Sequence, residues 1–65
     1  MMFIVYLRIN LKSMSTFEFA TMKLAEQFCL VATQAEDVQS AMICKHGVGK
    51  NMLILGTYAQ GQYLG

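Results

Sequence analysis

The sequence predicts a small α+β fold in which a strand, a long helix and a second strand follow one another along 65 residues. Three observations predict it. Apolar and polar residues alternate near the N-terminus, apolar residues then recur at steps of three or four, and a short apolar run follows a glycine-containing stretch. Alternation with a period of two is typical of a half-buried strand, whereas steps of three or four are typical of a helix. We expect a two-layer unit in which residues 1–65 form a single small domain.

The first predicted strand lies within residues 1–13, in the stretch MFIVYLRINLK. One face of this strand is wholly apolar, and its members are Phe3, Val5, Leu7, Ile9 and Leu11. The other face becomes polar toward Lys12, as expected for a strand that packs on a core with one side. An alternative is that residues 1–13 are upstream sequence read through, so the start is open between Met1, Met2 and Met14. We favour the strand, because read-through sequence would rarely alternate so regularly.

The second predicted element is a helix over residues 15–46. Ser15 and Glu18 have the spacing of a capping box, in which each side chain binds a backbone N–H group of the other residue. Apolar residues then keep the helical period through the whole stretch, at Phe17, Ala20, Leu24, Phe28, Val31, Ala35, Val38 and Met42. Thr33 and Glu36 repeat the capping-box spacing, so the alternative is a pair of helices that break near Thr33.

A partner surface is predicted from this helix. A continuous helix from Thr16 to His46 would be about 46 Å long, whereas a compact chain of this length has a radius of gyration near 11 Å. The helix would therefore break, or extend beyond the globule to meet a partner. A second, patchier apolar stripe lies roughly opposite the first, and its members are Phe19, Met22, Cys29, Leu30 and Ile43. We expect these residues to form a protein interface, with scattered surface hydrophobes as the alternative.

The stretch KHGVGKN, residues 45–51, partly matches the phosphate-binding pattern G-x-x-x-x-G-K-[ST]. The match fails because Cys44 stands where the first glycine belongs and Asn51 stands where the hydroxyl residue belongs. The end of a helix explains the stretch better: Gly47 takes the left-handed C′ position, and Val48 folds back on Ile43. An anion site remains a minor alternative, and it would use Lys45, His46 and Lys50.

The last predicted strand covers residues 51–58, where the length of a short apolar run and its flanking glycines indicate a buried strand and not a helix. Gly56 within it indicates a bulge or a close approach of the backbone. Residues 59–65 read as a turn or a loose tail, or alternatively as the extension of a hairpin. With a continuous helix between them, the two strands would run parallel. Two strands alone are marginally stable, so we expect a second copy to complete the sheet in a homodimer.

Composition narrows the classes of function. Hydrophobic residues make up 55% of the chain and charged residues 14%, against about 25% charged residues in ordinary proteins. This excess predicts an exposed apolar patch of the kind that binds partners. The basic residues are scattered, which argues against nucleic-acid binding. No apolar run approaches the length of a membrane span. The N-terminal stretch MMFIVYLRIN has no basic leader and no small-residue cleavage site, so we do not expect it to be a secretory signal. We expect a cytoplasmic protein in which Cys29 and Cys44 are buried thiols.

No pattern in the sequence points to catalysis, a cofactor or a metal. Cys44 and His46 lack the paired ligands of a zinc site, and on a helix they would point away from each other. We expect no enzyme activity. The hypothesis is a non-catalytic protein-interaction module of inhibitor or adaptor type, of the kind that mobile elements encode. The alternatives are a structural subunit of a larger, membrane-associated assembly, and a weak anion or small-ligand binder.

Overall fold

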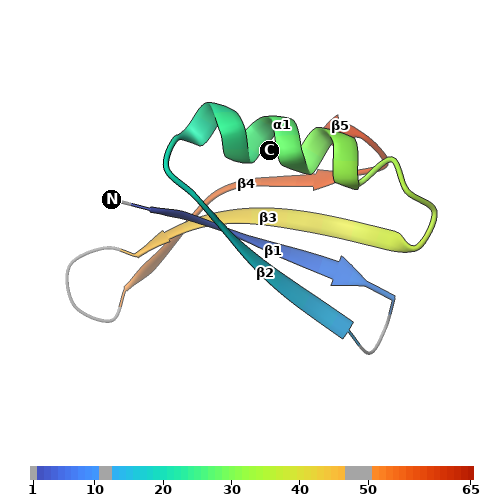
Figure 1. Ribbon diagram of the computed structural model, residues 1–65, viewed down its shortest axis with the longest axis horizontal. Coiled ribbons are helices and arrows are strands. Elements are labelled where there is room, and N and C mark those ends of the chain that lie inside the picture. The colour runs from blue at the N-terminus through green and yellow to red at the C-terminus, as the bar shows by residue number, and fades with distance from the viewer. Residues whose placement is uncertain (1, 11–12, 47–50) are drawn as a thin grey trace.

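The computed structural model describes residues 2–10, 13–46 and 51–65. It has a small α+β fold with one helix among these residues and a five-stranded antiparallel sheet, so strands dominate. The elements in chain order are β1 (Phe3–Ile9), β2 (Ser13–Phe19), α1 (Met22–Ala32), β3 (Val38–His46), β4 (Met52–Ala59) and β5 (Gln62–Tyr63) (Figure 1). The strands are ordered β2-β1-β3-β4-β5 across the sheet. The radius of gyration is 11.3 Å, as expected for a compact chain of this length.

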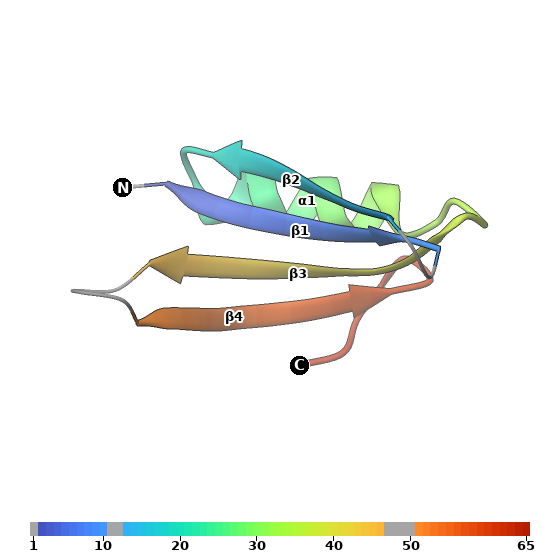
Figure 2. The ribbon, with the colours of Figure 1, turned by 90° about the horizontal axis from the view of Figure 1, so that it is seen from below.

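The core lies between α1 and one face of the sheet, and Figure 2 shows α1 behind the strands, on that face alone. Its buried hydrophobic members are Val5, Leu7, Ala25, Cys29, Ala41, Ile43 and Tyr58. Most of the strand residues come from β1 and β3, which are the inner strands of the sheet. Burial of these side chains is the main force that holds α1 on the sheet.

The first predicted strand is confirmed as β1. Val5 lies opposite Phe17 of β2 and Ile43 of β3, so the apolar face of the sequence is the face that packs under α1. Asn10 follows β1 with a φ of 60°, a left-handed conformation that asparagine tolerates better than most residues. Leu11 and Lys12 of the predicted strand lie outside the described residues.

The predicted helix over residues 15–46 is wrong at both ends, because Ser13–Phe19 and Val38–His46 are strands. Ser15 and Glu18 therefore form no capping box; both lie in β2. Serine, threonine and valine are mediocre helix formers, and pairing with β1 satisfies one side of the backbone in each of the two segments. The apolar residues of these segments have helical spacing, but strand pairing with β1 determines their structure.

The helix that does form begins and ends at threonines. Thr21 is its N-cap, and its Oγ1 accepts a hydrogen bond of 3.2 Å from the N–H of Leu24. Thr33 is its C-cap, so the capping-box spacing of Thr33 and Glu36 marks the end of a helix and not the start of one. Residues 34–37 form the turns that lead into β3.

The apolar stripes of the helix do not have the roles predicted, although Phe28 of the first stripe does pack against the core. Leu24 and Val31, from the stripe predicted to be the core, are 51% and 69% exposed, whereas Ala25 and Cys29 are fully buried. The predicted phase depended on residues outside the helix, since Phe17, Val38 and Met42 belong to strands. Once the helix is limited to Met22–Ala32, the sheet beneath it selects the other face.

The last predicted strand is found as β4, but its expected burial is wrong, because Met52–Leu55 is exposed. Both expectations for Gly56 are met. The register shifts between Ile43, which lies opposite Gly56, and Cys44, which lies opposite Ile54, so Leu55 is the extra residue of a bulge. A Cβ atom on Gly56 would lie 3.0 Å from Cε1 of Tyr63, so the backbone and this ring do approach closely. The alternative for the tail is also found, because β5 extends the hairpin from β4.

Neither the predicted strand order nor the helix end at residues 45–48 is found. β1 and β4 run in the same direction, but β3 lies between them. The expected helix is replaced by β2, α1 and β3, so the chain supplies its own sheet without a second copy. Lys45 and His46 are the last residues of β3, and Ile43 lies within the same strand. Gly47 and Val48, on which the helix end depended, lie outside the described residues.

Candidate functional site

The outer edge of β4 is open along its first half. β5 pairs only with Tyr58 and Ala59, and the N–H of Leu64 donates to the carbonyl of Thr57 at 2.8 Å. No strand in the described part of the chain pairs with the outer side of Met52–Gly56. Alternate backbone N–H and C=O groups along this stretch are therefore available to another chain.

The side chains along this open edge are apolar and exposed. Met52, Leu53, Ile54 and Leu55 are 44%, 55%, 58% and 37% exposed, respectively. Ile54 lies opposite Cys44 on the face away from α1, whereas Leu55 lines a pocket with residues of α1. Edge strands are normally protected by charge or proline, and β4 contains neither. The edge therefore offers apolar contacts on both faces of the sheet.

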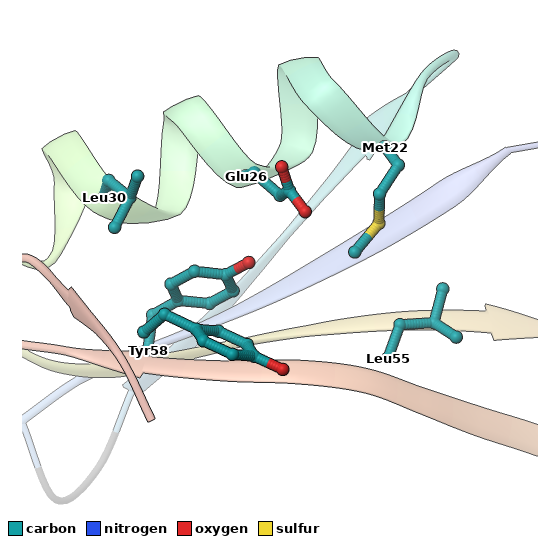
Figure 3. Close-up of a pocket in the computed structure, with 6 residues that line it drawn as sticks. Met22, Glu26, Leu30, Leu55 and Tyr58 are labelled. Atoms are coloured by element: carbon teal, nitrogen blue, oxygen red, sulfur yellow. The ribbon is translucent and has the colours of Figure 1, made fainter. Parts of the chain in front are cut away.

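A pocket of about 250 Å³ lies between this edge and α1. Its lining residues are Met22, Glu26 and Leu30 from α1, Leu55 and Tyr58 from β4, and Tyr63 from β5 (Figure 3). The rings of Tyr58 and Tyr63 lie with their centroids 5.3 Å apart at 53°, a tilted aromatic pair. Figure 3 shows the Glu26 carboxylate pointing from the helix into the pocket, above Tyr58.

Thr33 fixes the position of the aromatic wall of this pocket. Its hydroxyl donates to the carbonyl of Cys29 at 2.6 Å and accepts from the N–H of Gly61 at 2.9 Å. Gly61 has a φ of 74° and lies in the turn that joins β4 to β5. Thr33 is 2% exposed, so its hydrogen bond to Cys29 is shielded from water. The partly buried bond from Gly61 ties the turn to the end of α1.

Burial and the Glu26 carboxylate raise the pKa values of two groups near the pocket, Cys29 and Tyr58. Burial raises the pKa of Cys29 from its ordinary 9.0 to about 11, and the negative charge of Glu26 adds to the rise. Burial also raises the pKa of Tyr58, with a further contribution from Glu26. Cys29 and Cys44 are both free and buried, as predicted. A thiol in such surroundings stays protonated and is a poor nucleophile or metal ligand.

The residues predicted to form a protein interface lie in or against the core instead. Cys29 and Ile43 are fully buried, and Phe19, Met22 and Leu30 are partly buried and pack against the core cluster. Burial therefore excludes Cys29 and Ile43 from any surface of this fold. Met22 and Leu30 reach the candidate site only as walls of the pocket.

The residues predicted to bind an anion are not brought together. Lys45 places its Nζ 5.6 Å from the ring centroid of Phe3, in cation–π range. His46 is the next residue of the same strand, and successive strand residues point to opposite faces of a sheet. Lys50 lies outside the described residues. Lys45 and His46 therefore do not share a site.

The face of the sheet away from α1 is a second surface, with a different composition. A cavity of about 290 Å³ on it has Tyr6, Arg8, Met14, Ser40 and Leu64 among its lining residues. Tyr6 donates its hydroxyl to the Met52 sulfur at 3.8 Å, so this face adjoins the open edge of β4. Its lining mixes polar and apolar side chains, as the surfaces of many non-obligate interfaces do.

No group of three or more His, Cys, Asp or Glu residues that could hold a metal occurs within residues 2–10, 13–46 and 51–65. The helix of the described chain is too short to cross a membrane. Comparison of the sequence with protein family models and with curated proteins, and of the fold with solved structures, gives no match. The candidate site therefore rests on its geometry alone.

Sequence reasoning missed the open edge, Glu26 and the tyrosine pair. The run MLIL, residues 52–55, was identified as a buried strand because it is apolar. Its lack of any alternating polar residue would suit an inner strand, and only the strand order shows that it lies near the edge. A usable signal was the spacing of Tyr58 and Tyr63 around the turn at Gly61, which is that of a short hairpin with cross-strand tyrosines.

Proposed function

We propose that this chain is a non-catalytic protein-interaction module, of inhibitor or adaptor type, that accepts an extended strand of another protein along the edge of β4. The observation that carries the proposal is the exposed apolar stretch Met52–Leu55, whose outer side has no strand partner in the described chain. In this mode of recognition, backbone hydrogen bonds provide affinity and alternate side chains provide specificity.

A second copy of the chain is the second candidate partner. β4 contains no charged residue, so two copies related by a two-fold axis could pair their β4 edges antiparallel without opposing like charges. The same edge would also suit a role for this chain as a structural subunit of a larger assembly. Cytoplasmic residence suits the free thiols. An anion-binding role has less support, because Lys45 and His46 occupy opposite faces of β3.

The test is a titration with a blocked heptapeptide in which threonine and valine alternate around a central norleucine. Amide hydrogen exchange is followed by NMR at millimolar peptide. We expect exchange to slow at outward N–H groups within Met52–Gly56, because an added strand would bond to them. Protection that appears only along β2, or nowhere, would contradict the proposal.

A matched pair of variants gives this test its control. Ile54→Lys places a charge on the open edge and should reduce peptide affinity at least about tenfold, as lysines do on natural edge strands. Val31→Lys replaces an apolar residue that is more exposed than Ile54, on the outer face of α1, and should leave the affinity unchanged. Sedimentation equilibrium at micromolar concentration separates the two partners: a dimer that Ile54→Lys abolishes identifies the second copy.

A further inference from the structure

Glu26 is a carboxylate in apolar and aromatic surroundings. The other residues that line its pocket are Met22, Leu30, Leu55, Tyr58 and Tyr63. None of them is basic, and within the described residues the structure gives Glu26 no ion pair and no side-chain hydrogen bond. A half-buried charge of this kind is costly without a partner, which raises the question of what would neutralise it.

The size of the pocket limits the answer to a small group. Sites for whole ligands have volumes of about 300–1,000 Å³, whereas this pocket has about 250 Å³. The space therefore suits one side chain of a bound protein better than a complete cofactor. Two of its walls, Leu55 and Tyr58, belong to β4, so a strand that pairs with the β4 edge would place some of its side chains at the mouth of the pocket.

The chemistry of the pocket selects a cation. The faces of Tyr58 and Tyr63 attract ammonium and guanidinium groups through their ring quadrupoles, and the carboxylate of Glu26 supplies the opposite charge. Gly56 contributes by having no side chain, because a Cβ atom there would lie 3.0 Å from the Tyr63 ring. The ring can therefore lie against the backbone of β4 and form a wall of the pocket.

We propose that this pocket receives a lysine or arginine side chain from the strand that pairs with β4, held between the Glu26 carboxylate and the rings of Tyr58 and Tyr63. The inference rests on the proposed function, because it assigns the chemistry of the partner that binds at that edge. The partner's segment is accordingly extended, largely apolar and marked by one basic residue on the side that faces α1.

The experiment compares two blocked heptapeptides, the norleucine-centred peptide described above and the same peptide with a central lysine. We expect the lysine peptide to bind roughly five- to tenfold more tightly at low salt, the range for one ion pair with a cation–π contact. Raising the salt concentration should reduce that preference. Glu26→Gln, which keeps the shape of the side chain, should reduce the preference to the roughly two- to fourfold that the cation–π contact alone supplies, whereas Glu18→Gln on β2 removes the same charge far from the pocket and should preserve the full preference.

The outcomes separate the two proposals. If both peptides protect the β4 edge with equal affinity, or if Glu26→Gln leaves the preference for lysine undiminished, the cation site is refuted and the binding edge stands. If neither peptide binds at the edge, the proposed function fails and the cation site fails with it. A preference that depends on Glu26 and not on Glu18 supports both.

Discussion

The two edges of the sheet differ in composition and in cover. At the β2 edge four of the seven residues, Ser13, Ser15, Thr16 and Glu18, are polar or charged, and Met14 is an exposed apolar residue among them. Phe17 and Phe19 of the same strand are held by Phe28 of α1, with ring centroids 4.8 Å and 5.1 Å apart. The β4 edge is apolar over Met52–Leu55, and only its far end is paired, with β5.

This difference shows where the chain tolerates exposed backbone. A small sheet with one helix cannot cover both of its edges, and a polar or charged edge is the usual protection against unwanted pairing. β2 has that protection and β4 does not. An apolar edge left open is a liability for solubility unless a partner occupies it, and this contrast is the physical basis of the proposed function.

The largest expected effect comes from removing the aromatic contact that covers β2. Phe28→Ala deletes the ring that packs on both Phe17 and Phe19, so we expect the free energy of unfolding to fall by about 3 kcal/mol. Amide exchange should accelerate in β2 before it does in β4, making the two edges alike in exposure. Urea denaturation and hydrogen exchange measure these changes. Leu24→Ala, at an exposed site on the same helix, is the control, and an equal loss in both variants would argue against the special role of Phe28.

A slightly smaller loss of stability is expected at alkaline pH, where Cys29 of α1 titrates. The pKa of Cys29 is raised from 9.0 to about 11 in the folded protein, so the folded chain keeps a proton that the unfolded chain has lost. This contribution is complete below pH 9, declines as the pH rises from 9 to 11, and amounts to about 2–3 kcal/mol. Burial shifts Cys44 and Tyr58 in the same direction.

Three variants test whether the titration of Cys29 causes this loss of stability at alkaline pH. One removes the thiol, and the other two each remove the charge of one carboxylate. Cys29→Ala should flatten the decline in the urea midpoint between pH 9 and 11. Glu26→Gln should lower the pKa of Cys29, because its charge adds to the shift, whereas Glu18→Gln on β2 should not. If the decline persists unchanged in Cys29→Ala, the titrating group lies elsewhere in the core.

Thr33→Val tests the anchor at the β4 side. The substitution keeps the shape of the side chain but removes the acceptor for the N–H of Gly61 and the donor to the carbonyl of Cys29. We expect a loss of about 1–2 kcal/mol, since a shielded N–H group is left without a partner. Exchange should accelerate at Gly61 and in β5, while β2 stays protected. A uniform loss across the sheet would show that Thr33 supports the whole core and not this edge in particular.

The elements that could be predicted from the sequence are those whose local pattern of apolar residues agrees with their contacts in the fold. β1 alternates cleanly and is an inner strand with one face on the core, so pattern and structure agree. The apolar run of β4, and the bulge at its glycine, were predictable for the same reason: both are local properties of residues 52–58. The thiols were predictable because nothing in the sequence offered them another role.

The helix was mispredicted because two periods fit the same residues. Phe17 and Phe19 belong to a strand alternation, yet Phe17 also stands a helical step from Ala20 and Leu24. A choice between these periods depends on whether β1 is available to pair, and pairing between distant segments is not written in either local pattern. The site was missed for the related reason that an edge is defined by strand order, which no single strand encodes.

The smallest effect is expected for a substitution on the outer face of α1. It tests whether this face is exposed to solvent, as the two edges of the sheet are. Val31 is 69% exposed, so Val31→Lys should change the free energy of unfolding by less than about 0.5 kcal/mol and leave strand binding unaltered. The stripe predicted from the sequence would instead place Val31 in the core, where an unpaired charge costs several times more. A decrease of more than about 1 kcal/mol in the free energy of unfolding would therefore show that Val31 is buried. A neutral result leaves the edge of β4 as the apolar surface that distinguishes one side of this sheet from the other.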